Sequence, residues 1–218
     1  MTDDLFAAVG GLPKQKEALA DGAFLLHGYA CNQANDFLEA VHRMALQSPF
    51  RQMETPGGYR MSVAMTNCGA VGWTSDRHGY RYSAIDPLTG HPWPTMPADF
   101  QDFAREIAAE AGFPGFSPDV CLINRYAPGT KLSLHQDKDE VDLLAPIVSV
   151  SLGLPAIFVL GGLKRQDPGR RLGLRHGDVL VWGGPSRLRH HAVLPIKEGH
   201  HPATGNCRIN LTFRQARG

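Results

Sequence analysis

The tetrapeptide Leu134-His135-Gln136-Asp137 carries two metal-binding side chains two positions apart. In a β-strand, side chains at positions i and i+2 lie on the same face, so the His135 imidazole and the Asp137 carboxylate can reach one metal ion. A third ligand must then come from a distant strand. Two histidines and one carboxylate on one side of a metal leave open positions opposite, which is typical of iron(II) oxygenases.

The third ligand is expected in the segment Arg189-His190-His191-Ala192-Val193. Neighbouring residues of a strand point to opposite faces, so only one of the two histidines joins the site unless a bulge intervenes. His191 is the preferred candidate and His190 the alternative. Because the chain has 10 histidines, a chance pairing of His135 with Asp137 is the competing interpretation.

A second group of residues that could bind a ligand lies near the end of the sequence, in a segment that alternates strictly in polarity. The polar face of this expected strand consists of Arg208, Asn210, Thr212 and Arg214. Its two guanidinium groups start roughly 20 Å apart along a strand, and long side chains leaning inward can close that gap around a short diacid. Guanidinium is the bidentate partner of carboxylate, so a dicarboxylate such as 2-oxoglutarate fits. Asn124 and Tyr126 alternate on another expected strand and offer further polar partners, and a solvated strand face is the alternative.

The elements that must position these residues are mostly strands. One helix is expected from Asn35 or Asp36, as its N-cap, to Ala45, and a second from Asp99 to Ala111. After Pro118 nearly every segment is expected to be a strand: 120–126, 131–137, 147–152, 156–160, 179–182, 191–196 and 208–214. Gly and Pro separate these strands at short intervals, which predicts a mainly β protein with flanking helices, the strands forming a barrel or sandwich of the jelly-roll kind.

Length and composition predict a single globular domain spanning residues 1–218. The hydrophobic share is 43% and the charged share 20%, and 22 basic residues nearly balance 21 acidic ones. Overall charge therefore does not indicate nucleic-acid binding, and any such surface must be local. Four widely spaced cysteines, an acidic start without a secretory signal and the lack of a long apolar run predict a cytoplasmic protein without a membrane partner, expected to be a monomer.

A local positive surface is expected in the stretch of about residues 50–90, between the two helices. Within residues 51–85 four arginines stand against two acidic residues, and aromatic and methionine side chains are interleaved with them: Tyr59, Trp73, Tyr80, Tyr82, Met61 and Met65. Positive charge attracts phosphates, and aromatic faces stack on unpaired bases. A hairpin whose aromatic side chains pack on the core is the alternative interpretation.

Together with these motifs, longer segments of the chain resemble the AlkB family of 2-oxoglutarate-dependent nucleic-acid demethylases. The resemblance covers nearly the whole chain from about Ser48. It rests on Ser48-Pro-Phe-Arg-Gln-Met, Thr55-Pro-Gly-Gly-Tyr, Met61-Ser-Val-Ala-Met-Thr-Asn-Cys, Cys121-Leu-Ile-Asn-Arg-Tyr-Ala-Pro-Gly, Leu132-Ser-Leu-His-Gln-Asp-Lys-Asp-Glu, Pro146-Ile-Val-Ser-Val-Ser-Leu-Gly-Leu-Pro-Ala-Ile-Phe and Gly177-Asp-Val. It implies a double-stranded β-helix (jelly-roll) core at about 118–215 and a nucleotide-recognition lid at about 50–90.

The resemblance also implies roles for individual residues. It selects His191 rather than His190 as the third iron ligand beside His135 and Asp137. The residues implied to hold or shape the site of 2-oxoglutarate are Asn124, Tyr126, Arg208, Asn210, Thr212, Arg214, Leu132, Ile147, Ser149, Trp182 and Ser186. Those expected to contact the substrate are Trp73, Tyr80, Met61, Met65, Thr55, Lys131, Lys138, Asp139, Glu140 and Arg165, with Trp73 and His135 on the two faces of the base. His190 departs from the family pattern, where an aromatic residue is expected.

The implied activity is oxidative demethylation of N-alkylated bases such as 1-methyladenine and 3-methylcytosine, with Fe(II), 2-oxoglutarate and O₂, releasing formaldehyde and succinate. Single-stranded DNA is the expected substrate, and double-stranded DNA and RNA are further candidates. The main alternative is the same chemistry on a protein or a small molecule. A nucleic-acid-binding module with a vestigial metal site, or a zinc hydrolase, would leave Arg208 and Arg214 without a joint purpose.

Overall fold

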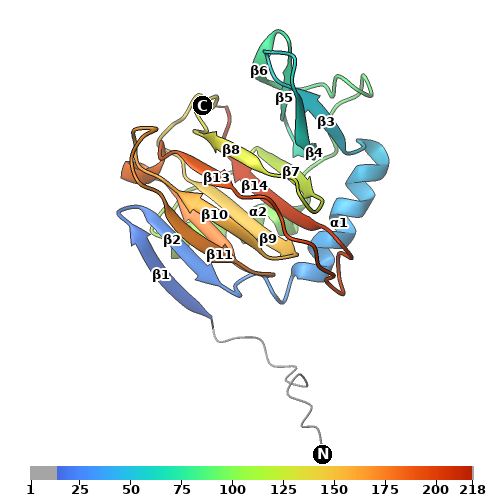
Figure 1. Cartoon of the computed structure of the whole chain (residues 1–218). Helices are drawn as coiled ribbons and strands as arrows, with labels where there is room; N and C mark the ends of the chain where they lie inside the picture. Colours follow the sequence, from blue (N-terminus) through green and yellow to red (C-terminus); the bar gives the residue numbers. More distant parts are fainter. Residues whose placement is uncertain (1–13, 218) are drawn as a thin grey trace, which may run out of the picture.

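Strands dominate the computed structural model, which describes residues 14–217, and most of them form one large antiparallel sheet (Figure 1). Its eight strands lie in the order β1 (Gln15–Ala20), β2 (Ala23–His27), β12 (Val179–Trp182), β9 (Ile147–Gly153), β14 (Arg208–Arg214), β7 (Val120–Tyr126), β4 (Arg60–Gly69) and β3 (Arg51–Glu54). The second sheet has the order β11 (Arg170–Leu174), β10 (Ala156–Leu160), β13 (His191–Val193) and β8 (Leu132–His135). A two-stranded hairpin of β5 (Gly72–Asp76) and β6 (Gly79–Ser83) stands beyond β3 and β4 (Figure 1).

The two sheets are joined by a shared apolar core. Ile147 and Trp182 of the large sheet cluster with Phe158, Leu160 and Leu172 of the small one. Their packing leaves the polar residues of the inner strands enclosed between the sheets. This arrangement of two antiparallel sheets around one interior confirms the predicted mainly β fold of the jelly-roll kind.

Strand β14 lies in the middle of the large sheet, hydrogen-bonded to β9 on one side and β7 on the other. All seven of its residues are buried. Ile209, Leu211 and Phe213 belong to the core that the helices cover, so the alternating polar side chains face the interior between the sheets. The alternative of a solvated strand face is therefore wrong.

Helices α1 (Ala34–Gln47) and α2 (Ala98–Glu110) cover the outer face of the large sheet. Their contact is aromatic: the rings of Phe37 and Phe100 meet edge to face at 4.9 Å, and Phe100 meets Phe213 of β14 at 5.7 Å. Both helices begin one or two residues earlier than predicted, so Asn35 and Asp36 lie inside α1 rather than at its N-cap. Neither helix is long and apolar enough to cross a membrane.

The predicted strand bounds hold at β7, β10, β12 and β14. The strand predicted at 131–137 ends at His135, so Asp137 lies outside it, and the one predicted at 191–196 ends at Val193. Strands β1 to β4 belong to the same large sheet as β7, β9, β12 and β14, so the sheet extends beyond the stretch of about 118–215 expected for the core. A short 3-10 helix, Gly184–Ser186, follows β12. The acidic start of the sequence lies outside the described residues.

All four cysteines are free. Cys68 of β4 and Cys121 of β7 are buried register partners. Burial raises the pKa of the Cys121 thiol, so it stays protonated.

Candidate active site

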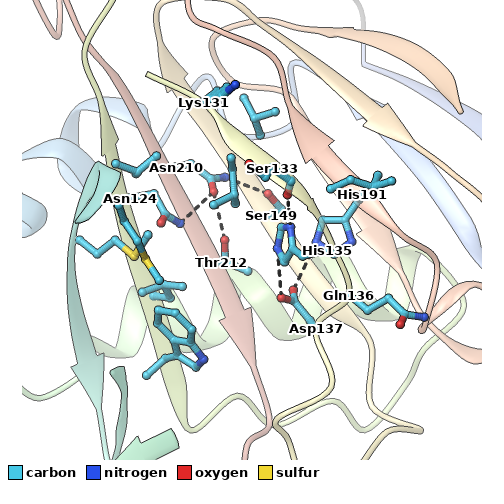
Figure 2. A pocket seen from close by; sticks show the side chains of 18 of the residues that line it. Asn124, Lys131, Ser133, His135, Gln136, Asp137, Ser149, His191, Asn210 and Thr212 are labelled. Atoms are coloured by element: carbon cyan, nitrogen blue, oxygen red, sulfur yellow. Dashed lines mark hydrogen bonds and ion pairs between the residues drawn. The ribbon is translucent and has the colours of Figure 1, made fainter. Parts of the chain in front are cut away.

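A cavity of about 680 Å³ lies between the two sheets and is bounded by residues of β4, β5 and β6. This size falls within the range of small-molecule sites, roughly 300–1,000 Å³. Its wall combines polar residues from β7, β9 and β14 with the ends of β8 and β13 (Figure 2). The cavity therefore brings together the two groups of residues that the sequence singled out.

His135, Asp137 and His191 meet on one side of this cavity (Figure 2). His135 ends β8 and His191 begins β13, and the two are register partners whose rings lie 4.3 Å apart. Asp137 Oδ1 lies 3.5 Å from His135 Nε2, and Asp137 Oδ2 lies 3.6 Å from His191 Nε2. One possible ligand atom of each residue lies within 4.8 Å of those of the others, a cluster that could hold a metal ion.

The backbone orients both imidazoles toward the carboxylate. His135 Nδ1 is 2.8 Å from the carbonyl of Ser133, and His191 Nδ1 is 3.0 Å from the carbonyl of Arg189. A carbonyl can only accept, so each Nδ1 carries the proton and donates it. The Nε2 lone pairs are then available to a metal, as in histidine ligands whose other nitrogen is held by a carbonyl.

The pKa shifts of Asp137 and His191 favour the protonation states that bind a metal, and the shift of His135 has the opposite direction. Burial acts to raise the pKa of Asp137, but the Arg214 guanidinium and the two histidines outweigh it and hold that pKa well below its ordinary value. Burial and the neighbouring His135 lower the pKa of His191, which favours the neutral imidazole. Burial also acts to lower the pKa of His135, yet its bond to Asp137 raises it on balance.

The polar face of β14, together with Asn124 of β7 and Ser149 of β9, forms what we call the inner wall. Within it Arg208 is 1% exposed and donates only to Ser151 Oγ, at 3.0 Å, and its guanidinium carbon lies 5.0 Å from the centre of the Tyr126 ring. Its Nε and Nη1 have no partner among residues 14–217, and neither has Asn124 Oδ1. A buried guanidinium without a counter-ion is costly, and its burial lowers the pKa of Arg208. A carboxylate in the cavity would satisfy it.

Asn210 occupies the centre of the inner wall with every amide donor and acceptor engaged (Figure 2). Its Nδ2 donates to Ser149 Oγ at 2.8 Å and to the carbonyl of Val150 at 2.9 Å. Its Oδ1 accepts from Thr212 Oγ1 at 3.0 Å and from Asn124 Nδ2 at 3.3 Å. An asparagine can make four such bonds, so the amide is fully used within the wall, and it fixes its neighbours.

Arg214, at the other end of β14, is paired inside the protein. Its Nη2 donates to Asp137 Oδ2 at 2.8 Å, and its Nη1 donates to the hydroxyl of Tyr82 at 3.1 Å. Both arginines line the cavity, but one nitrogen of Arg214 already donates to the carboxylate of the metal cluster, whereas Arg208 faces no carboxylate within residues 14–217.

The opposite side of the cavity is formed by the β5–β6 hairpin with the neighbouring half of β4, which we call the hairpin wall. Trp73 and Tyr80 stack there with their ring centres 5.5 Å apart, and Trp73 Nε1 donates to Asp139 Oδ2 at 2.9 Å. Part of the expected positive charge is neutralised: Arg81 pairs with Asp76 at 2.6 Å and Arg51 with Asp86 at 2.8 Å.

Most of the residues predicted for the site line the cavity. Besides the three metal candidates, they are Asn124, Tyr126, Arg208, Asn210, Thr212, Arg214, Leu132, Ser149, Trp182, Trp73, Tyr80, Met61, Met65, Thr55, Lys131, Lys138, Asp139 and Arg165. Three predicted residues do not line it. Ile147 is buried in the core between the sheets, Ser186 donates to the carbonyl of Asp21, and Glu140 is enclosed by Arg187 and Tyr82.

The structure adds two residues that the sequence did not single out. Phe158 and Gln136 line the cavity, and Gln136 Nε2 donates to the carbonyl of Leu188. Tyr59 and His190, both named from the sequence, also line it, although only His191 joins the metal cluster. Phe158 and Gln136 belong to no spacing pattern, so only their contacts reveal them.

Comparison with known proteins gives the same picture. Residues 22–214 match the model of the 2OG-Fe(II) oxygenase superfamily. The chain is 64% identical over 201 residues to the alpha-ketoglutarate-dependent dioxygenase AlkB of Escherichia coli K12, covering 92% of this chain and 93% of that protein. It is 33% identical over 174 residues to the DNA N(6)-methyladenine demethylase ALKBH1C of Arabidopsis thaliana, covering 68% of this chain and 38% of that one. The solved structure of OsALKBH1 superimposes with a TM-score of 0.81 at 30% identity, covering 92% of this chain and all of that one.

Proposed function

The chain belongs to the AlkB family of the 2OG-Fe(II) oxygenase superfamily, and from this premise we propose which of its residues hold iron, 2-oxoglutarate and the damaged base. As a member of this family it is an alpha-ketoglutarate-dependent dioxygenase that demethylates alkylated nucleic acids oxidatively. Fe(II), 2-oxoglutarate and O₂ are its cofactor and co-substrates.

One observation carries the residue assignment: a cluster of two histidines and one carboxylate shares a cavity with a buried arginine that has no counter-ion. Both halves of the site fit the groups that the family uses. Imidazole and carboxylate suit iron(II), and a lone buried guanidinium suits one carboxylate of 2-oxoglutarate. A zinc hydrolase would need the cluster but would leave Arg208 without a purpose.

His135, Asp137 and His191 would hold the iron, and Arg208 with Asn124 and Tyr126 would hold the distal carboxylate of 2-oxoglutarate. Iron(II) held there would supply the oxidising chemistry with O₂ and 2-oxoglutarate: one oxygen atom of O₂ would go into formaldehyde from the N-methyl group and the other into succinate, with release of carbon dioxide. The protein's share is to orient these groups and to exclude water. Asn210 would keep the inner wall in place through its bonds to Thr212 and to Ser149 of β9.

The hairpin wall would receive the base. An enzyme that acts on a base atom must take the base out of the stack, and aromatic faces replace the lost stacking. Trp73 and Tyr80 supply such faces, and Lys131, Lys138 and Arg165 at the rim supply positive charge for phosphates. The carboxylate of Asp139 would favour cationic bases such as 1-methyladenine and 3-methylcytosine. Met61, Met65 and Thr55 complete the lining.

We also propose that the enzyme acts as a cytoplasmic monomer on single-stranded DNA, with duplex DNA and RNA as further substrates. The four free cysteines support a reducing compartment. Size-exclusion chromatography with light scattering tests the monomer, and parallel assays on DNA and RNA oligonucleotides test the preference.

The test of the site is anaerobic loading with Fe(II), followed by O₂, 2-oxoglutarate and a single-stranded DNA carrying one 3-methylcytosine. Succinate, formaldehyde and the mass of the oligonucleotide are measured together. Equal amounts of both products, with loss of one methylene from the oligonucleotide, are expected for the wild type. His135→Ala is expected to abolish all three, and His201→Ala, which lies outside the cavity, is expected to leave them unchanged.

Release of succinate without base repair would support the oxygenase activity and indicate that the substrate is a protein or a small molecule. Full activity in His135→Ala would overturn the assignment of the iron ligands.

A further inference from the structure

A buried arginine holds the connection between β8 and β9, residues 137–145, at three points. Arg187 follows the short 3-10 helix, and its side chain is 2% exposed. Its Nε donates to the carbonyl of Ala145 at 2.9 Å, its Nη1 to the carbonyl of Asp137 at 2.6 Å, and its Nη2 to Glu140 Oε2 at 3.0 Å. One guanidinium therefore ties together the start, middle and end of the segment that carries the metal-binding carboxylate.

Glu140 extends this set of contacts to the hairpin. Its side chain is 1% exposed, its Oε1 accepts from the Tyr82 hydroxyl at 2.6 Å, and Arg214 Nε lies 3.5 Å from the same oxygen. Tyr82 in turn accepts from Arg214, which donates to Asp137 Oδ2. The contacts close into a ring that runs from Asp137 through Arg214, Tyr82, Glu140 and Arg187 back to Asp137; we call it the buried ring.

The hairpin is fixed to the same segment at a second point. Tyr82 of β6 and Trp73 of β5 are direct register partners, and they bond to the adjacent residues Glu140 and Asp139. A displacement of the hairpin would therefore strain the buried ring, and a displacement of Asp137 would be transmitted to the hairpin. The bonds of Tyr82 and Trp73 therefore connect the hairpin wall to the segment that carries Asp137.

Stability alone does not explain these groups. The buried ring contains two guanidinium groups and two carboxylates, so its charges balance, but apolar residues of similar volume commonly replace buried ion pairs without loss of stability. What such groups do supply is defined geometry, since each bond has a fixed direction. Burial raises the pKa of Tyr82 well above its ordinary value, so its hydroxyl remains a donor to Glu140.

We propose that Tyr82, Glu140 and Arg187 are positioning residues that couple the hairpin carrying Trp73 to the metal-binding carboxylate of Asp137. The inference rests on the proposed function of the cavity and assigns Glu140 a role behind it rather than in contact with the base. Coupling between two sites is reciprocal. We expect a favourable coupling, in which filling the metal and 2-oxoglutarate sites strengthens binding of the methylated oligonucleotide through the buried ring.

The test measures that gain without turnover. The dissociation constant of a fluorescent single-stranded DNA with one 3-methylcytosine is determined anaerobically by anisotropy, with and without Mn²⁺ plus 2-oxoglutarate. The ratio of the two constants is expected to be about 5 or more in the wild type, the usual lower range of such couplings. Tyr82→Phe removes one oxygen atom, and Glu140→Gln keeps the shape while removing the charge. Both are expected to bring the ratio close to one.

Tyr29→Phe is the matched control, because Tyr29 lies against the helical core and outside the cavity. It is expected to keep the wild-type ratio. A second readout is the yield of succinate per formaldehyde under O₂, which is expected to rise above one in Tyr82→Phe and to stay at one in Tyr29→Phe. Thermal melting of each variant shows that it is folded.

A wild-type ratio of one, or an unchanged ratio in both Tyr82→Phe and Glu140→Gln, would overturn the coupling. The proposed function fails differently, since a wild-type enzyme that releases no formaldehyde from the methylated oligonucleotide would overturn it whatever the binding ratio.

Discussion

The inner wall and the hairpin wall face each other across one cavity, yet they are built in opposite ways. Asn210 makes four hydrogen bonds in the inner wall, and the polar residues of β14 are buried. Across the cavity, Tyr80 is exposed, Trp73 is partly exposed, and the indole of Trp73 makes one side-chain bond, to the exposed Asp139. The inner wall is enclosed and, apart from Arg208 and Asn124, hydrogen-bonded within itself, whereas the aromatic faces of the hairpin wall are open to solvent.

The difference agrees with the ligand that we propose for each wall. 2-Oxoglutarate is one molecule with two carboxylates, so a well-ordered wall with an unpaired charge at Arg208 would suit it. An alkylated base arrives on a flexible strand and can differ in its identity, so a wall of exposed aromatic faces would suit it better. Substitutions on the two walls should therefore separate stability from substrate binding, and the following variants test this.

The largest effect is expected from Arg208→Met. Removal of one partner of a buried charge pair costs about 2–5 kcal/mol, so affinity for 2-oxoglutarate should fall by roughly 100-fold or more. The protein without 2-oxoglutarate should melt at the same or a higher temperature, because an unpaired buried charge has been removed. Thermal melting with Mn²⁺ gives both quantities. The rise in melting temperature on addition of 2-oxoglutarate reports the affinity, and the melting temperature without 2-oxoglutarate reports the stability.

Arg171→Met on the exposed part of β11 is the control for Arg208→Met. Its affinity for 2-oxoglutarate and its melting temperature should both equal those of the wild type. A normal 2-oxoglutarate-dependent rise in melting temperature in Arg208→Met would show that the inner wall does not hold the co-substrate by charge.

Asn210→Ala should instead affect stability. The substitution leaves the amide of Asn124, the hydroxyl of Ser149 and a backbone carbonyl without their partner. Because each buried group left unbonded costs about 1–3 kcal/mol, we expect the free energy of unfolding to fall by about 2–4 kcal/mol. Urea unfolding without metal or co-substrate measures it. The exposed Asn206→Ala should leave the midpoint unchanged, and an equally stable Asn210→Ala would remove the basis for calling this wall well ordered.

Trp73→Ala tests the hairpin wall. Loss of one stacking face costs about 1–3 kcal/mol per base, so the dissociation constant of the methylated oligonucleotide should rise roughly 5- to 100-fold. The loss of unfolding free energy should be smaller than in Asn210→Ala, since Trp73 is partly exposed. For the same preparation, anisotropy titration gives the dissociation constant and urea unfolding gives the free energy of unfolding. The reverse order of effects would contradict the contrast between the walls.

The smallest effect is expected from Asp76→Asn, on the exposed turn of the hairpin. Arg81 holds the pKa of Asp76 below its ordinary value, so at neutral pH the carboxylate is ionised and neutralises this arginine. Freeing Arg81 adds at most one contact to a phosphate, so unmodified single-stranded DNA should bind about twofold more tightly at low salt. Titrations at several salt concentrations check this, and weaker binding would show that Arg81 does not face the nucleic acid.

Strand periodicity predicted the central elements correctly for a physical reason. Strands β7, β10, β12 and β14 carry buried, apolar side chains between Gly or Pro breaks, and their bounds hold to the residue. Strands β1 and β11 escaped prediction because Gln15–Ala20 and Arg170–Leu174 are exposed over much of their length and lack a continuous apolar face. The conformation of an edge strand depends on its pairing with a neighbouring strand, and this pairing cannot be predicted from the local sequence pattern.

The residues of the site fall into the same two groups, those predicted from a local pattern and those revealed only by their contacts. The spacing of His135 and Asp137 and the alternation of Arg208 to Arg214 indicated the metal cluster and the inner wall, and the resemblance to the AlkB family was needed to select His191 as the third ligand. Glu140 was assigned to the cavity because of its charge, and only its contacts with Arg187 and Tyr82 reveal that it lies behind it. These partners are 47 and 58 residues away in sequence, so no local pattern links them.

The central place of β14 has a consequence for how the protein is made. During synthesis this strand leaves the ribosome after β7 and β9, the two neighbours between which it must insert. Until then both neighbours expose unpaired backbone and apolar side chains, which is the state in which sheets aggregate. A nascent chain halted before Arg208 would therefore lack all of β14 and expose two open strand edges. Yield of soluble enzyme should accordingly depend on chaperone supply more than on the stability of the finished fold.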